Sequence, residues 1–394
     1  MVARERERVS LVQDVSIKTF ADLQQEVVQA GLCGKCGGCV SFCSAGQLHA
    51  LEPDEQGFPR YSDESRCLKC GICYLICPVT SDLEAELQQK FARELPAGGR
   101  MVITSARSTD PEVRQVATDG GVVTALLLYM LDRRLIDGAI VSRRTGLFSR
   151  VPLIATTREE IIAAAGSHFS GSSHLERLGE QYTTYTPTIS AVRGLAGNRL
   201  SRVALVGTPC QVNTIRKMQC LSILPADVIT YTLGLFCWEN FAFTAETLQN
   251  RLGVDLDDIA KINIKDELIV VLNSGRTLHV PLAQVDDLAR PACLACGEFA
   301  NDYADLSFGG LGSPQGYTTV LIRAPKGQRL YTEALRQGYI EELAFSDASQ
   351  MRSEKTKMMA KVVAFTQRKR ERGRVRKAEL AAAAASVDQG GSSG

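Results

Sequence analysis

The chain lacks most of the features that would point to a membrane or a polyanion. Its 45 Lys and Arg residues balance 44 Asp and Glu residues, so bulk charge gives no reason to expect nucleic acid as a partner. No run of 18 uninterrupted apolar residues occurs, and VVTALLLYML at 122–131 predicts a buried helix. The first residues, MVARERERVS, carry no apolar signal core, so we expect a cytoplasmic protein.

A dinucleotide signature is also missing. No G-x-G-x-x-G fingerprint occurs, so a Rossmann-type site has no support. The 394 residues are enough for two or three domains with a large core. The chain is instead rich in cysteine, with 13 residues, most of them spaced for metal, which indicates a reducing compartment.

Eight cysteines form two matched runs near the N-terminus. Both runs read C-x2-C-x2-C-x3-C, the spacing of bacterial ferredoxins that bind 4Fe-4S clusters. The eight residues are Cys33, Cys36, Cys39, Cys43, Cys67, Cys70, Cys73 and Cys77. Zinc or disulfides would need only pairs of cysteines, so the runs favour two clusters and one-electron transfer.

The fourth ligand of each cluster is expected to come from the other run. Three closely spaced thiolates can hold three corners of a cubane, and two-cluster ferredoxins exchange the last cysteine. This rule groups Cys77 with the first run and Cys43 with the second. Pro78 follows the second run, whereas Ser44 stands where the first run's proline would be.

Three domains are predicted along the chain. Residues 1–95 form a two-cluster 4Fe-4S ferredoxin domain with a hairpin at 48–66 and a helix at 81–95, and Pro and Gly residues then mark a linker. Residues 100–345 form an α/β flavoprotein core. Residues 346–394 form a basic helical tail and flexible C-terminus, and the basic run at 368–377 is interpreted as a solvated helix face or a docking surface for a partner.

The core is predicted from alternating strand and helix patterns with an antiparallel hairpin insertion at 261–282. Strands are expected at 101–106, 139–144, 202–207 and 228–237, and a Gly-rich loop between strands at 305–325. Helices are expected at 118–134, 157–166 with Thr156 or Thr157 as cap, and 208–218.

Five cysteines lie outside the two runs. Cys293 and Cys296 form a C-x2-C pair, and Cys210 and Cys237 follow predicted strands, where α/β proteins place chemistry. These four predict a third 4Fe-4S cluster, although tetrahedral zinc fits the same spacing. Cys220 is expected to pack in the core.

Several segments resemble the beta subunit of coenzyme F420-reducing hydrogenases and of the dehydrogenases that oxidise reduced coenzyme F420. They occur in the family's order, at 118–131 (TDGGVVTALLLYML), 166–172 (GSHFSGS), 206–211 (VGTPCQ), 234–241 (GLFCWENF), 261–266 (KINIKD) and 293–323. With a ferredoxin module in front, the layout is similar to the input subunit of the dehydrogenase. It is also similar to the N-terminal half of the deazaflavin-dependent sulfite reductase.

The resemblance implies FAD, a 4Fe-4S cluster in the core, and coenzyme F420 as substrate. It implies substrate or reduced-flavin contacts at Lys265, His168 and Asn240, with His168 standing where the family commonly has Lys. The implied flavin-binding residues are Asp119, Gly120, Gly121, Thr124, Gly166, Ser167, Ser170, Gly207, Thr208, Gln211, Ser307, Gly309, Gly310, Gly312 and Ser313.

Together these features predict an iron-sulfur flavoprotein. Hydride from reduced coenzyme F420 enters at FAD, and electrons leave singly through the clusters to a partner redox protein. The partner would be a hydrogenase or a heterodisulfide-reductase-like or complex-I-like assembly. Through that partner, the protein could attach peripherally to the cytoplasmic face of the membrane. The alternatives are a ferredoxin-dependent reductase of an organic substrate, of the 7-hydroxymethyl chlorophyll a reductase type, and a flavin-free electron relay.

Overall fold

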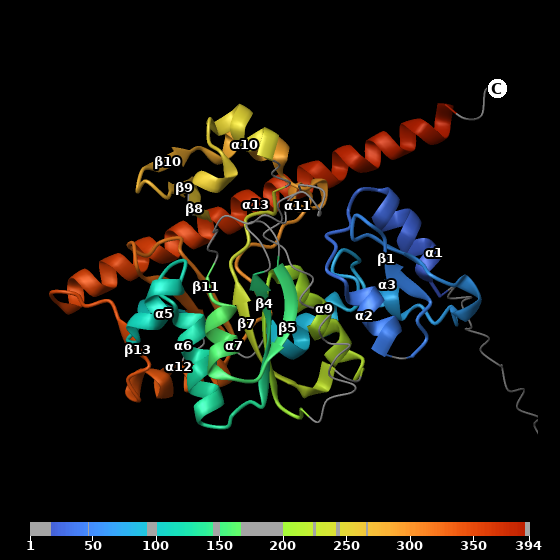
Figure 1. Ribbon diagram of the computed structural model, residues 1–394. Coiled ribbons are helices and arrows are strands. Elements are labelled where there is room, and N and C mark those ends of the chain that lie inside the picture. Colours follow the sequence, from blue (N-terminus) through green and yellow to red (C-terminus); the bar gives the residue numbers. More distant parts are fainter. Residues whose placement is uncertain are drawn as a thin grey trace, which may run out of the picture.

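The computed structural model shows an N-terminal module beside an α/β core, with one long helix running across the core (Figure 1). It describes residues 17–45, 47–92, 101–144, 150–166, 200–223, 226–241, 245–264 and 267–390. No helix in these ranges is both long and apolar enough to cross a bilayer.

The N-terminal module is a set of short elements around its own apolar cluster. The predicted hairpin is confirmed, since Leu51 of one strand pairs with Tyr61 of the other. Phe20 and Leu23 are buried in the cluster beside several of the cysteines. The elements are α1 (Phe20–Leu23), η1 (Gln24–Gln29), α2 (Gly38–Ala45), β1 (Leu51–Pro53), β2 (Pro59–Tyr61), η2 (Glu64–Arg66), α3 (Ile72–Leu75), α4 (Glu84–Leu87) and η3 (Gln88–Ala92).

An eight-stranded sheet forms the core, in the order β13-β3-β12-β11-β7-β6-β4-β5. The neighbours β4, β6, β7 and β11 run parallel, whereas β3, β5, β12 and β13 pair antiparallel with their neighbours. The strands are β3 (Val102–Ser108), β4 (Gly138–Arg144), β5 (Arg150–Ala155), β6 (Val203–Gly207), β7 (Ile229–Leu235), β11 (Leu306–Gly309), β12 (Thr318–Ile322) and β13 (Ile340–Glu342).

Helices follow the strands, as the alternating pattern predicted. The predicted buried helix is α6 (Val122–Asp132), which packs with α12 (Pro325–Arg336) against the sheet. The predicted cap at Thr157 is confirmed, because its side chain and that of Glu160 form a capping box at the start of α7 (Arg158–Ala163). A short helix, α5 (Pro111–Val116), precedes α6.

Thr208 begins the helix that faces the N-terminal module. This helix, α9 (Pro209–Cys220), starts with a capping box in which Thr208 donates from its backbone to Gln211 Oε1 at 2.8 Å. Gly38 of α2 packs so tightly on α9 that an added Cβ would lie 2.3 Å from Thr214 Cγ2. The close contact fixes the module against α9.

The predicted hairpin at 261–282 is part of a three-stranded antiparallel sheet. Its strands are β8 (Ile259–Ile264), β9 (Leu268–Leu272) and β10 (Thr277–Val280). Short elements flank it: η6 (Ala226–Val228), α10 (Ala245–Leu252), η7 (Leu256–Asp258), η8 (Leu282–Gln284), η9 (Asp286–Leu288) and α11 (Pro291–Leu294).

The C-terminal region is helical, in line with the predicted basic helical tail. It forms one helix, α13 (Ala348–Gly390). Met358, Val362 and Lys369 are buried, with the two apolar residues in the cluster that joins α13 to β8–β10. The interpretation of 368–377 as a solvated face is therefore wrong at Lys369, because tertiary packing placed this lysine inside.

Candidate functional site

The first thiol set consists of Cys33, Cys36, Cys39 and Cys77. Burial raises the pKa of Cys39 well above its ordinary value, and the thiolates of Cys36, Cys33 and Cys77 raise it further. Burial also raises the pKa of Cys77 to about 12, and Cys36 and Cys33 add to that effect. Cys77 therefore lies with the first run, the arrangement that exchange of the fourth ligand requires.

The second thiol set consists of Cys43, Cys67, Cys70 and Cys73. Burial raises the pKa of Cys73 to about 12, and the neighbouring thiolates of Cys70, Cys67 and Cys43 contribute. The Cys43 thiol accepts a hydrogen bond from the backbone amide of Ala50 at 3.3 Å. Cys43 thus lies near the second run.

The two runs share their backbone conformation. Lys35 and Lys69, each preceding the second cysteine of its run, have φ of 56° and 51°. Gly37 and Gly71, each following that cysteine, have φ of 75° and 73°. Because left-handed backbone is costly for lysine, its recurrence at matched positions indicates the same loop built twice around the same kind of ligand.

The third thiol set consists of Cys210, Cys237, Cys293 and Cys296. Burial raises the pKa of Cys237 to about 12, opposed by Lys369, while Cys293 and Cys296 raise it further. Burial raises the pKa of Cys210 well above its ordinary value, with Cys36, Cys237 and Cys296 as further causes. The four cysteines, distant in sequence, come together from α9, the end of β7 and the α11 turn.

The first and third thiol sets adjoin through α9. Thr214 of α9 lies 3.6 Å from Cys36 Sγ and donates to the Cys210 carbonyl oxygen at 2.9 Å. The thiolates of Cys36 and Cys210 also interact electrostatically. A cavity of about 880 Å³ beside α9 reaches all four cysteines of the third set as well as Pro78 and Gly34 of the module.

A second cavity, of about 340 Å³, lies where the parallel strands β6, β7 and β11 end. Ligand sites of open α/β sheets occur at this edge. Nine of the predicted flavin-binding residues line it: Asp119, Gly121, Thr124, Gly166, Gly207, Thr208, Gln211, Gly309 and Gly310. Cys237 lines both this cavity and the thiol cavity, so the two adjoin at this residue.

The remaining predicted flavin and substrate residues lie elsewhere or cannot be placed. Gly120 is packed in the core, since an added Cβ would lie 2.6 Å from the Ala106 carbonyl oxygen. Ser307 is buried, donates to the Asn301 carbonyl at 3.1 Å and does not line the flavin-side cavity. Residues 167, 168, 170 and 265 (Ser167, His168, Ser170 and Lys265) lie outside the described residues.

Three other predicted positions line cavities other than the flavin-side one. Gly312 and Ser313 line a separate cavity of about 370 Å³ under the start of α13. Asn240 lines the thiol cavity, and its backbone hydrogen bond lowers the pKa of Cys293 against the larger effect of burial.

Glu239 was missed by the sequence reasoning. It lines the flavin-side cavity, is 2% exposed, and burial raises its pKa to about 7 against the opposing guanidinium of Arg372. Its position two residues after Cys237, at a strand end, was the available signal.

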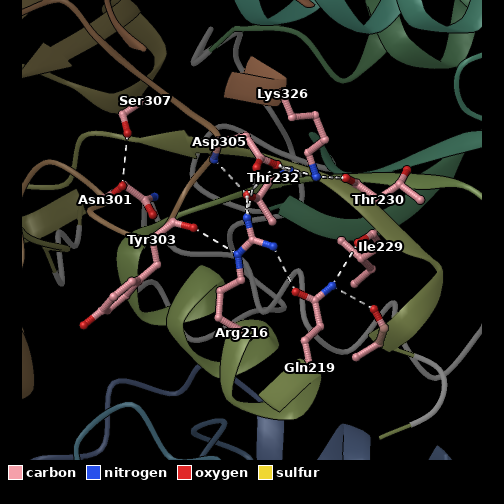
Figure 2. Close-up of polar contacts among 11 residues, drawn as sticks. Arg216, Gln219, Ile229, Thr230, Thr232, Asn301, Tyr303, Asp305, Ser307 and Lys326 are labelled. Atoms are coloured by element: carbon pink, nitrogen blue, oxygen red, sulfur yellow. Dashed lines mark hydrogen bonds and ion pairs between the residues drawn. The ribbon is translucent and has the colours of Figure 1, made fainter. Parts of the chain in front are cut away.

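A buried polar network joins α9, β7 and the segment that follows Cys296 (Figure 2). Arg216 of α9 donates to the Tyr303 carbonyl at 3.0 Å and to Thr232 Oγ1 of β7 at 2.7 Å, and pairs with Asp305 at 3.2 Å. Asn301 donates to the Gly207 carbonyl at 2.9 Å. The network ties α9 and β7 to the 301–305 segment that follows Cys296.

The donor chemistry of the three thiol sets fits 4Fe-4S clusters, since each set offers four thiols. Backbone amides also reach the thiols, as Glu298 N does at Cys296 Sγ, 3.5 Å away. Within the described ranges, no group of three or more His, Cys, Asp or Glu residues is arranged to hold a metal ion. The clusters therefore remain a prediction.

Comparisons with known proteins match two family models. Both describe the beta subunit of coenzyme F420 hydrogenase/dehydrogenase. The model of its N-terminal part matches residues 103–178, and the model of its C-terminal part matches residues 200–348.

Individual relatives agree. The chain is 34% identical over 251 residues to the beta subunit of coenzyme F420 hydrogenase from Methanosarcina barkeri, covering 62% of this chain and 82% of that protein. It is 26% identical to a subunit of the F(420)H(2) dehydrogenase of Methanosarcina mazei, covering 78% of this chain and 83% of that protein. It is 29% identical to coenzyme F420-dependent sulfite reductase of Methanocaldococcus jannaschii, covering 77% of this chain but 46% of that protein.

A solved structure is similar as well. A chain of the F420-reducing [NiFe] hydrogenase complex from Methanosarcina barkeri superposes with a TM-score of 0.55 at 28% identity, covering 70% of this chain and 91% of that chain.

Proposed function

The chain belongs to the family of coenzyme F420 hydrogenase/dehydrogenase beta subunits, and on that basis we propose that it is an oxidoreductase linking reduced coenzyme F420 to a partner redox protein. We propose FAD and three 4Fe-4S clusters as its cofactors. Residues 1–95 would be the two-cluster ferredoxin domain, residues 100–345 the FAD domain, and the partner a hydrogenase or another multisubunit redox complex.

The supporting observation is a continuous row of sites. Cys237 adjoins the flavin-side cavity, Cys210 lies next to Cys36, and Cys39 interacts with Cys73 of the second set. Each of these residues therefore lies within electrostatic reach of the next site or lines it. A row of this kind suits single-electron transfer from an internal cavity to the second set, where Cys70 is exposed.

The flavin-side cavity offers features that suit FAD. Bound FAD would accept a hydride and release electrons one at a time, whereas each 4Fe-4S cluster carries one electron. Thr208 begins α9 at the cavity, and helix N-termini favour phosphate and other anions. Phe236, Phe299 and Phe308 supply apolar surface for an aromatic ring system.

The substrate contacts are proposed at Lys265 and His168. A cationic lysine would suit the acidic tail of coenzyme F420. Asn240 is the third proposed contact, and it lines the thiol cavity, where its backbone hydrogen bond reaches Cys293.

The test is anaerobic purification with iron and flavin counted, followed by reduction with reduced coenzyme F420, NADH or reduced ferredoxin. We expect flavin absorbance together with broad iron-sulfur absorbance, and bleaching of both by reduced coenzyme F420 only. Bound flavin that stays oxidised with reduced coenzyme F420 would refute the proposed substrate. Iron without flavin would favour the electron-relay alternative, and bleaching by reduced ferredoxin alone the ferredoxin-dependent reductase.

A matched pair of variants tests the third thiol set. Cys237→Ser should lower the iron content by about one cluster and uncouple flavin reduction from reduction of the ferredoxin clusters. Cys220→Ser is the control, because Cys220 ends α9 and packs against an apolar cluster that contains none of the proposed ligands. Equal iron content in both variants would contradict the proposed ligand.

A further inference from the structure

Helix α13 lies directly on the loop that carries Cys296. Gly373 of α13 approaches so closely that an added Cβ would lie 2.8 Å from both the carbonyl carbon and the carbonyl oxygen of Cys296. On the loop side, a Cβ on Gly297 would lie 3.4 Å from Arg370 Cα. Two glycines, one on each surface, let the helix backbone come this near. The family models end at residue 348, where α13 begins.

One turn before Gly373, α13 inserts a lysine among the thiols of the third set. Lys369 is 1% exposed, and its Nζ donates to the Cys237 carbonyl oxygen at 2.5 Å. Its electrostatic neighbours are the thiolates of Cys296, Cys237 and Cys293 and the Glu298 carboxylate. A buried ammonium group so close to three cysteines is a fixed positive charge at the third set.

Neighbouring side chains of α13 hold this helix in position. Arg370 pairs with Asp302 at 2.8 Å, and Arg372 pairs with buried Glu239 at 2.9 Å. The guanidinium groups of Arg368 and Arg372 lie 5.3 Å and 4.6 Å from the Trp238 ring centroid. Lys369 therefore has little freedom to move away from the Cys237 carbonyl.

The first thiol set has an equivalent cation. Lys217 of α9 is fully buried, and its Nζ donates to the Cys77 carbonyl at 2.6 Å and to the Thr80 carbonyl at 2.8 Å. In both cases an ammonium group bonds to the carbonyl of a cysteine in the set. The two lysines come from different helices, so each can be altered separately.

We propose that Lys369 sets the reduction potential of the third cluster, an inference that rests on the proposed cluster at Cys210, Cys237, Cys293 and Cys296. Reduction adds one negative charge to a buried site, where charges interact strongly. The fixed ammonium group of Lys369 would stabilise that added charge, so a cluster held by these four cysteines would be easier to reduce. Lys369 would act through its charge and its position, without a bond to the cluster. Lys217 would act in the same way on the first cluster.

The experiment is a redox titration followed by electron paramagnetic resonance on the anaerobically purified full-length protein. Lys369→Met should lower the equilibrium constant for reduction of the third cluster about tenfold or more, and tenfold corresponds to about 59 mV for a one-electron couple. Lys217→Met should shift a ferredoxin-domain cluster instead. Lys357→Met is the control on the same helix, because Lys357 is 68% exposed and pairs with Glu354 one turn away.

Two further variants separate charge from packing. Lys369→Gln keeps a hydrogen-bond donor for the Cys237 carbonyl but removes the charge. The reduction potential of the third cluster should therefore fall as it does in Lys369→Met. Gly373→Val keeps the lysine but lifts the helix from Cys296, and should also lower the potential. If the third cluster keeps its wild-type reduction potential in Lys369→Met or Lys369→Gln, the role of Lys369 is refuted while the proposed cluster stands. Wild-type iron equivalent to two clusters would overturn the third cluster and the proposal together.

Discussion

Removing the Asp305 carboxylate should unfold the core at much lower denaturant concentration. Asp305 and Arg216 are each 6% exposed in their side chains and pair at 3.2 Å. The same carboxylate accepts from the Thr232 amide at 2.8 Å and lies 3.3 Å from Lys326 Nζ (Figure 2). Asp305→Ala leaves the buried guanidinium without its counter-charge.

The expected loss follows from that burial. Removing one partner of a buried ion pair costs about 3–5 kcal/mol, because the other charge stays desolvated. Arg216 keeps its bonds to the Tyr303 carbonyl and Gln219, so we place Asp305→Ala at about 4 kcal/mol. The double variant Arg216→Met with Asp305→Ala should recover part of that loss, since no unpaired charge remains.

The assay is anaerobic urea unfolding followed by the emission of the single tryptophan, with iron content measured alongside. Asp287→Ala is the matched control, because its pair with Arg251 has side chains 48% and 56% exposed and should contribute less than about 1 kcal/mol. If Asp305→Ala costs no more than Asp287→Ala, the buried network does not support the core as reasoned.

Three further changes have defined outcomes. Gly120→Ala should cost about 1–3 kcal/mol of unfolding free energy, because its Cβ would lie 2.6 Å from the Ala106 carbonyl; wild-type stability in urea would contradict that contact. Gly373→Val should shift the emission of Trp238, 4% exposed beneath α13, to longer wavelength; unchanged emission would mean the helix stays docked. Asp137→Asn should lower the free energy of unfolding at neutral pH, because bonds from Arg202 and Ser201 hold the pKa of Asp137 below its ordinary 3.8. A depressed carboxylate pKa stabilises above 3.8 and loses that stabilisation as pH falls, so urea unfolding of the two proteins should converge in acid.

Local patterns predicted structure well because their causes lie within a few residues. The capping boxes at Thr157 and Thr208 involve side chains three residues apart, so the starts of α7 and α9 could be predicted. The buried helix at 122–132 followed from its run of apolar residues. The NSG turn at 273–275 predicted the hairpin at 261–282. Its strands β9 and β10 pair with each other, and β9 also pairs with β8 in a sheet of three strands.

Hydrogen-bond partners that lie far apart in the sequence were not predicted. Ser307 and Ser313 were expected at the flavin because they stand in a Gly-rich segment. Ser307 bonds Asn301 and receives a hydrogen bond from Arg323 at 2.7 Å, and Ser313 lies 2.8 Å from Ser105. Buried hydroxyl groups must find partners, and the strands beside them supplied these.

By itself, the sequence determined the chemistry available to this protein: the spacing of its cysteines, the residue types of the loops at the strand ends, and the family whose segments it carries. The tertiary structure decided which groups meet. It brought Cys210, Cys237, Cys293 and Cys296 together from three parts of the chain. It also buried Lys369, one residue of the basic run, against the Cys237 carbonyl. The physical reason is that burial and charge pairing depend on which surfaces pack together, and no local pattern around Lys369 records the thiolates that surround it.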